Sequence, residues 1–357
     1  MTEYKNSNAG IIKAVPKTAD NQYGIIEVDV VPAGRPTMVV LGGELTYIPR
    51  FANHYLGQIR RVLEAANVTG AELYSVYYEF GSRDADIDRI NLFRRAKRKL
   101  LNMKRNRQAM EFKTEQMATN EPNPVYLDKL YNAIMRPIIF DNNTQTPYDV
   151  QTAAKNASLL RFYTHSHGGA AVTELGAMMA KDMRKMGFTN TQIKNILQNV
   201  VVIQHAPITT LENPLFTTLT FASASDTRMN LYNLFSEFAY ENAMNMYPSY
   251  FSQNGAHLFA AGQIMSTMAG EHDNAGLIET ARLTDDGKVI MAAERNAIIN
   301  SMQSAIDGNA TPTVDKLVGG DGVDWDDLVR NGNWFYDNML KNIKRHKKRI
   351  PAPDYQK

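Results

Sequence analysis

The stretch LLRFYTHSHGGAAVTELGAMMAKDM, residues 159–183, runs from an apolar segment through a short polar turn directly into a helical pattern. Leu159–Tyr163 predicts a buried strand. A strand that turns sharply into a helix can hold one side chain out at the top of a sheet, and Ser166 occupies that position. We therefore expect Ser166 to be a nucleophile. The helix that follows, to about Met186, has one apolar face: Ala171, Leu175, Met178, Met179 and Met183.

This turn resembles the nucleophile elbow of the α/β-hydrolase family, G-x-S-x-G, in which the residues that flank the serine must be small. Gly168 stands at the second position after Ser166, as the pattern requires, whereas Thr164 stands where the first glycine is expected. The resemblance covers roughly Thr37–Ile306. It implies an α/β fold with a mostly parallel sheet flanked by helices, and a serine hydrolase.

The pattern before the turn also predicts alternating strands and helices. Residues 1–22 are polar and mixed, and we expect an extended or disordered lead-in there. Three strands are expected: Tyr23–Val31, Thr37–Leu41 and Glu72–Phe80. The helix expected between the last two has an apolar face made by Ile59, Val62, Leu63 and Ala66. A strand, a helix and a strand in succession predict parallel pairing.

The remaining pattern gives the domain organisation. Residues 81–149 predict a helical insertion outside the sheet, within a hydrolase-like domain of residues 23–306, and residues 307–357 predict an extension with a basic tail. Further elements are expected in this order: a helix at Gln192–Leu197, strands at Val200–Gln204, Leu219–Ala222 and His257–Ala261, and a closing helix at Val289–Ile306. The aromatic stretch Leu231–Phe251 is expected to lie in the hydrophobic core or, alternatively, to form the cap of an acyl-binding cleft.

A serine nucleophile needs a base that a carboxylate orients. In the family that this chain resembles, the acid and then the histidine follow the serine, each after a later strand. Asp226 follows the strand TLTFASAS, and His272 lies in the loop after the last expected strand, so these two are implied as the acid and the base. His257 is a rival base and Asp273 a rival acid, and Asp226 taken alone fits a turn or a helix cap better than a catalytic acid.

The resemblance also implies two sources of oxyanion donors. One is the backbone N–H of His167, directly after the nucleophile, and the other is the loop after the earlier apolar strand, here Gly42 and Gly43. The two glycines could instead only turn the chain.

His165 and His167 permit a different chemistry. The sequence THSHGG is similar to the opening of the metallo-β-lactamase motif T-H-x-H-x-D-H, and two histidines on one face of a strand can bind a divalent ion. Gly169 and Ala170 replace the next aspartate and histidine of that motif. A metal-dependent hydrolase therefore stays an alternative.

Composition limits the remaining choices. The 357 residues are 44% apolar, which allows a large globular core, and the absence of cysteine excludes disulfides, thiolate metal sites and a cysteine nucleophile. No run is long enough to span a membrane, and the first residues do not resemble a secretory signal. We expect a cytoplasmic protein that needs no cofactor.

Charge is unevenly distributed along the chain. Arg94–Arg107 holds eight basic residues and no acid, and Lys341–Arg349 holds six more. Removing these 14 from the 39 basic residues leaves 25 against 37 acidic ones, a formal charge of about −12 for the remainder. The two basic runs predict a solvated surface or contact with an anionic partner. A non-catalytic binding module on a hydrolase-like scaffold is therefore a second alternative to the serine hydrolase, beside the metal-dependent hydrolase. The first expectation remains hydrolysis of a carboxylic ester or lipid-like acyl substrate.

Overall fold

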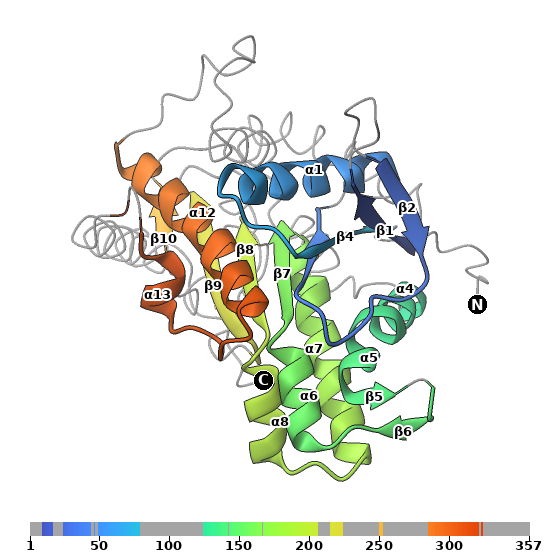
Figure 1. The fold of residues 1–357 in the computed structure, drawn as a ribbon. Helices are drawn as coiled ribbons and strands as arrows, with labels where there is room; N and C mark the ends of the chain where they lie inside the picture. Colours follow the sequence, from blue (N-terminus) through green and yellow to red (C-terminus); the bar gives the residue numbers. More distant parts are fainter. Residues whose placement is uncertain are drawn as a thin grey trace, which may run out of the picture.

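One sheet organises the molecule (Figure 1). The computed structural model describes residues 9–16, 24–43, 46, 49–78, 124–141, 143–165, 167–205, 215–223, 250–252, 285–320 and 323 of the chain. Within these residues, eight strands form a single sheet in the spatial order β10-β9-β8-β7-β3-β4-β1-β2. All neighbours from β10 to β4 pair in parallel, whereas β1 is antiparallel to both β4 and β2. The expected α/β class with a mostly parallel sheet is confirmed.

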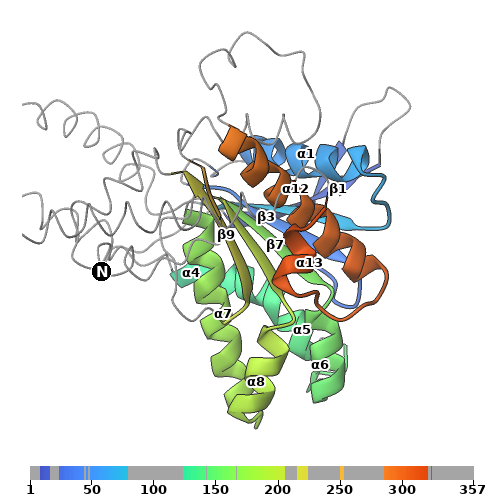
Figure 2. The ribbon, with the colours of Figure 1, turned by 90° about the vertical axis from the view of Figure 1, so that its left-hand side faces the viewer.

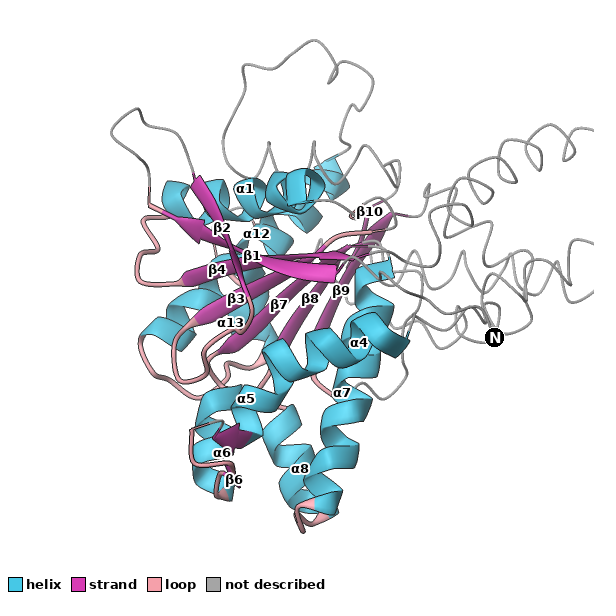
Figure 3. Ribbon diagram, turned by 90° about the vertical axis from the view of Figure 1, so that its right-hand side faces the viewer, coloured by secondary structure: helices cyan, strands magenta, loops and turns pink. Residues whose placement is uncertain are grey.

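The strands of this sheet are β1 (Ala9–Val15), β2 (Gly24–Val28), β3 (Thr37–Leu41), β4 (Glu72–Tyr78), β7 (Leu160–His165), β8 (Val201–His205), β9 (Thr217–Ser223) and β10 (Tyr250–Ser252). A separate hairpin pairs β5 (Phe140–Asp141) with β6 (Thr146–Pro147). Helices α1 (Pro49–Ala65), α12 (Asp285–Ile306) and α13 (Val314–Val318) lie on one face of the sheet (Figure 2). The other face carries α4 (Pro124–Leu130), the π-helix η1 (Tyr131–Met135), α5 (Arg136–Ile139), α6 (Val150–Ala157), α7 (His167–Lys185) and α8 (Asn190–Leu197) (Figure 3).

The central strands are buried on both faces, which explains why apolar residues predominate in them. Every residue of β3, β7 and β8 is buried. Val39 and Phe162 join the core beneath α4–α8, while Val40 and Tyr163 join the core beneath α1 and α12. A strand covered by helices on both sides has no solvent-facing position, so its sequence lacks polar alternation.

The first strand–helix–strand unit forms as the sequence predicts. β3 and β4 pair in parallel, with α1 between them in the chain. Ile59, Val62 and Leu63 of α1 are buried against the sheet, whereas the predicted fourth apolar residue, Ala66, is half-buried just beyond the end of the helix.

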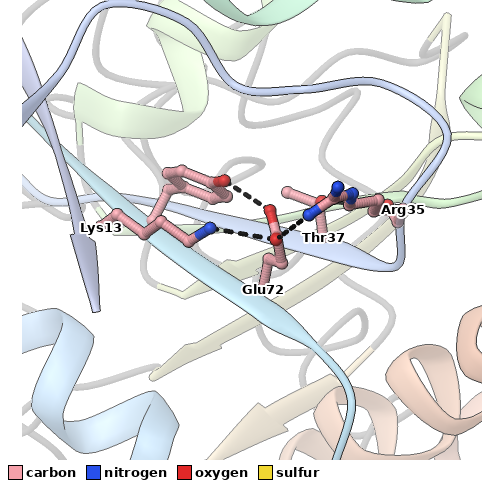
Figure 4. Close-up of polar contacts among 5 residues, drawn as sticks. Lys13, Arg35, Thr37 and Glu72 are labelled. Atoms are coloured by element: carbon pink, nitrogen blue, oxygen red, sulfur yellow. Dashed lines mark hydrogen bonds and ion pairs between the residues drawn. The ribbon is translucent and has the colours of Figure 1, made fainter. Parts of the chain in front are cut away.

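The chain enters the sheet earlier than its polar lead-in predicts. Residues Ala9–Val15, expected to be extended or disordered, form β1 between β4 and β2. Lys13 of β1 donates to Glu72 Oε1 at 3.0 Å, and Arg35 Nη1 donates to the same oxygen at 2.9 Å (Figure 4). Tyr74 donates to Glu72 Oε2 at 2.5 Å. This cluster links β1, the turn before β3, and β4.

Three further elements differ from the sequence-based expectation. Helix α6 was not predicted, and its N-cap Asp149 accepts a hydrogen bond from the backbone N–H of Thr152. Strand β10 lies at the end of the aromatic stretch Leu231–Phe251. Helix α13 lies in the expected extension, yet Leu317 is fully buried beside α12. The predicted strand at His257–Ala261 falls outside the described residues.

Arg161, near the amino end of β7, is a fully buried arginine. Its Nε donates to the carbonyl of Ser301 in α12 at 3.0 Å, and its Nη1 donates to the carbonyl of Leu160 at 3.0 Å. Burial lowers the pKa of the Arg161 guanidinium to about 10. A buried cation is tolerated only with such partners, so Arg161 joins the central strand to the closing helix.

Candidate functional site

The carboxyl ends of three neighbouring strands meet at one edge of the sheet. Gly42 directly follows β3, while His165 ends β7 and His205 ends β8. The register pairs Leu41 with Thr164, and His165 with His205. Open parallel sheets bind ligands outside the carboxyl ends of their strands, so this edge is the candidate site.

The link between β7 and α7 is short in sequence. β7 ends at His165 and α7 begins at His167, so a single residue, Ser166, separates strand from helix. A Cβ on Gly168 would lie 2.4 Å from the carbonyl oxygen of Leu41. The second residue after Ser166 must therefore be glycine, because α7 begins in contact with the backbone of β3. Thr164, in the position of the first glycine, is fully buried.

Most of the predicted catalytic residues lie outside the described part of the chain: Ser166, Asp226, His272, and the rivals His257 and Asp273. The same is true of the basic segments Arg94–Arg107 and Lys341–Arg349. The predicted oxyanion residues are placed. His167 is the first residue of α7, and Gly42 and Gly43 follow β3 at the same edge of the sheet.

The Gly42–Gly43 loop is held by two tyrosines. Tyr78 donates to the Gly42 carbonyl at 2.6 Å, and the Gly43 backbone lies near enough to the Tyr55 hydroxyl to lower its pKa. A Cβ on Gly42 would lie 2.2 Å from Thr46 Oγ1 and 2.7 Å from a ring carbon of Tyr55. The loop therefore needs glycine at position 42.

Tyr55 connects this loop to the end of β7. Its hydroxyl lies 2.8 Å from Nδ1 of His165, and the two ring centroids are 5.6 Å apart. Burial raises the pKa of Tyr55 to about 12, against the opposing effect of the nearby Gly43 backbone. The hydroxyl is thus protonated at neutral pH and can donate to Nδ1 of His165.

His205 is held by a buried carboxylate. Its Nδ1 lies 3.1 Å from both Oε1 and Oε2 of Glu294, a residue of α12. Tyr163 also donates to Glu294 Oε1, at 2.8 Å, and burial together with the nearby carboxylate holds the pKa of Tyr163 well above its usual value. Nδ1 of His205 can donate to this carboxyl group, and the two contacts fix the orientation of the imidazole.

The two histidines contact each other. The ring centroids of His165 and His205 are 5.7 Å apart, with an interplanar angle of 36°. Sequence reasoning did not identify Tyr55, His205 or Glu294 as part of the site. A local signal existed only for His205, which ends an apolar strand at the edge where sites form.

The placement of His165 and His167 changes the argument for a metal site. His165 ends a strand and His167 begins a helix, so the two do not share one face of a strand as that argument required. Nδ1 of His165 is in contact with Tyr55. No group of three or more His, Asp or Glu side chains in the described part of the chain is arranged to hold a metal ion.

Comparison with known proteins gives no family for the chain. No family model and no curated protein matches it. Solved structures similar to it include a hyperthermophilic esterase from the archaeon Pyrobaculum calidifontis, with 10% identity, a TM-score of 0.34, and 84% of this chain and 83% of that chain covered. Another is the esterase domain of a Rhodothermus marinus protein, with 13% identity, a TM-score of 0.25 and coverage of 74% and 97%. Scores this low carry no conclusion about this chain.

None of the described helices combines the length and the apolar character that a membrane span needs.

Proposed function

We propose that this protein is a serine hydrolase that cleaves a carboxylic ester or lipid-like acyl substrate. The observation that carries the proposal is the one-residue turn between β7 and α7, with Ser166 at the turn and Gly168 packed on the carbonyl oxygen of Leu41. Such a turn at the carboxyl edge of a parallel sheet presents a serine hydroxyl to a ligand.

The proposed chemistry proceeds in two steps. The Ser166 oxygen attacks the ester carbonyl while its proton passes to His272, which Asp226 orients. The carbon–oxygen bond to the leaving alcohol breaks, and the alcohol takes the proton from His272. Water then attacks the acyl-enzyme, His272 removes one proton from that water, and the acid is released as Ser166 regains its hydrogen.

The oxyanion that forms in each step needs backbone donors. The N–H of His167 is proposed as one donor, because it begins the helix directly after Ser166. The loop at Gly42 and Gly43 is proposed as the second source.

A fluorophosphonate, which reacts with activated serines, tests this proposal. We expect the full-length protein to be labelled at Ser166, without sensitivity to a chelator, and to hydrolyse members of a panel of short and long acyl esters. Ser166→Ala should lower turnover by about 10⁴-fold or more. Ser158→Ala is the matched control, because its hydroxyl only donates to the carbonyl of Lys155 at the end of α6.

The other outcomes distinguish the alternatives. Loss of ester cleavage on chelation would favour the metal-dependent hydrolase that uses His165 and His167. An unlabelled protein that turns over no ester would refute the hydrolase and leave a binding module, whose anionic partner should then bind more weakly after removal of Lys341–Arg349. His272→Ala is expected to abolish labelling, because His272 is the proposed general base. If labelling is lost only in His257→Ala or only in His205→Ala, that histidine is the base instead.

A further inference from the structure

The Tyr55 side chain contacts two chain segments that are distant in sequence. Its ring packs against Gly42 after β3, where an added Cβ would lie 2.7 Å from a ring carbon, and its hydroxyl lies 2.8 Å from Nδ1 of His165 at the end of β7. Its own backbone belongs to neither segment, because Tyr55 lies within α1. One side chain therefore contacts both the glycine loop and the last residue of the strand.

A second set of contacts holds the same histidine. The His165 ring packs on His205, which Glu294 holds through both carboxylate oxygens, and Tyr163 holds Glu294 in turn. Tyr163 and His165 are two residues apart on β7, so their side chains point to the same face of the sheet. His165, Glu294 and Tyr163 are each only 1% exposed.

Burial makes these contacts restrictive. A buried polar group that loses its partner pays the full cost of desolvation, so each member keeps the next in place. These contacts run from Tyr55 on α1, through His165 and His205, to Glu294 on α12. The two helices, α1 and α12, pack on the same core. The end of β7 has little freedom to move relative to the Gly42–Gly43 loop.

We propose that Tyr55 is a positioning residue, which couples the Gly42–Gly43 loop to the strand end before Ser166, with His205 and Glu294 holding His165 from β8 and α12. This inference rests on the proposed hydrolase function of the same site. It assigns to Tyr55 no contact with the substrate. Its role is to keep the oxyanion loop and the nucleophile turn at a fixed separation, which acyl transfer requires.

Tyr55→Phe tests the inference, because it removes the hydroxyl and keeps the ring. We expect the maximal rate of fluorophosphonate labelling to fall about five- to tenfold, the usual effect of one hydrogen bond, while the concentration for half-maximal labelling changes less than twofold. Tyr131→Phe is the matched control. It removes a hydroxyl that donates to Asp182 at 2.7 Å on the other face of the sheet, and should label at the wild-type rate.

Two outcomes of this labelling, with one further measurement, separate the possible failures. Labelling of Tyr55→Phe at the wild-type rate, in a protein that is otherwise labelled, would overturn the positioning role and leave the hydrolase intact. If the wild-type protein is not labelled, the proposed function fails. The hydrogen bond is then tested alone by ¹⁵N NMR, in which Tyr55→Phe should shift the His165 Nδ1 resonance, and an unchanged resonance would overturn the inference.

The same logic applies to the other end of the series. Glu294→Gln keeps an acceptor for His205 and Tyr163, whereas Glu294→Ala removes it. We expect labelling to be slower in Glu294→Ala than in Glu294→Gln, with thermal unfolding of both variants measured in parallel. Equal, wild-type labelling rates in both variants would contradict a role for this carboxylate in holding His165.

Discussion

Single glycines in the helices beside the sheet have very different surroundings. A Cβ on Gly168 would lie 2.4 Å from a backbone oxygen of β3, which cannot move without distorting the sheet. A Cβ on Gly57, within α1, would contact nothing within 4 Å. Gly57 has no positive φ, so alanine fits its backbone conformation as well. The two positions therefore predict opposite effects of the same substitution.

We expect Gly57→Ala to raise the free energy of unfolding by about 0.5–1 kcal/mol, because alanine loses less backbone entropy in a helix than glycine does. Gly168→Ala should lower it by about 1–3 kcal/mol, since the added methyl overpacks the contact between α7 and β3. Urea denaturation of both variants measures these changes. Equal stability of Gly168→Ala and wild type would show that the contact is looser than described.

Glu72 gives a pH-dependent prediction. Burial raises its pKa, but the hydrogen bonds from Tyr74, Lys13 and Arg35 outweigh that effect and lower it overall. The folded state therefore binds the Glu72 proton more weakly than the unfolded state. Its contribution to stability is complete above the unfolded pKa and is lost as pH falls through the folded pKa.

The free energy of unfolding should accordingly decline below about pH 5, and Glu72→Gln should make that decline shallower. Denaturant titrations between neutral and acidic pH compare the two proteins. A parallel decline in both would mean that other carboxyl groups account for the acid sensitivity.

At the scale of single residues, the sequence predicted what is local. Gly168 was recognisable from a short local motif, although the requirement for glycine there comes from contact with the carbonyl oxygen of Leu41 in β3. His205 and Glu294 are 89 residues apart, and Tyr55 is 110 residues from His165. Their contacts exist only once the sheet has formed, so no spacing in the sequence indicates them.

At the scale of elements, helix starts are defined by specific side chains. Thr189 caps α8: its Oγ1 accepts from the backbone N–H of Gln192 at 3.3 Å, and Gln192 Oε1 accepts from the backbone N–H of Thr189 at 2.8 Å. This reciprocal pair satisfies two amide groups that the first turn of a helix would otherwise leave without acceptors.

Thr189→Ala should lower the free energy of unfolding by about 1 kcal/mol, because the first turn of α8 loses its acceptor. Thr189→Ser keeps the hydroxyl and should cost only a few tenths of that value. Thermal and urea unfolding of the pair provide the measurement. Equal losses in both variants would attribute the effect to the methyl group instead of the cap.

Elements were predictable where their burial produces a strong pattern. β3, β7 and β8 are buried on both faces, and α7 has a long apolar face, so each has a clear signature. β1 has Lys13 near its centre and polar neighbours in sequence, which hide its strand pattern. Lys13 is accommodated there because it donates to Glu72 at the start of β4. α6 is short, and alanines make up much of its buried surface, which gives little periodicity.

At the scale of the whole molecule, β1 is part of the core shared by the sheet and α1. Ile12 of β1 is fully buried in the core that also contains Ile59 of α1. Ile26 of the neighbouring edge strand β2 is 49% exposed. The two isoleucines therefore sit on adjacent strands but differ in what their removal exposes.

Ile12→Ala should lower the free energy of unfolding by about 2–5 kcal/mol, the cost of a cavity in a packed core. Ile26→Ala should change it by less than about 0.5 kcal/mol, as surface substitutions usually do. Chemical denaturation of the full chain measures both. A small effect of Ile12→Ala would restore the interpretation of the first 22 residues as a lead-in outside the fold.

The buried guanidinium of Arg161 also constrains when this protein can fold. Its acceptor on Ser301 is synthesised 140 residues after it. A nascent chain that has emerged only as far as β8 would have to desolvate that cation with an incomplete set of acceptors. Ribosome-bound chains stalled before Ser301 should therefore stay sensitive to protease around β7, and the sheet should consolidate only after α12 has left the ribosome.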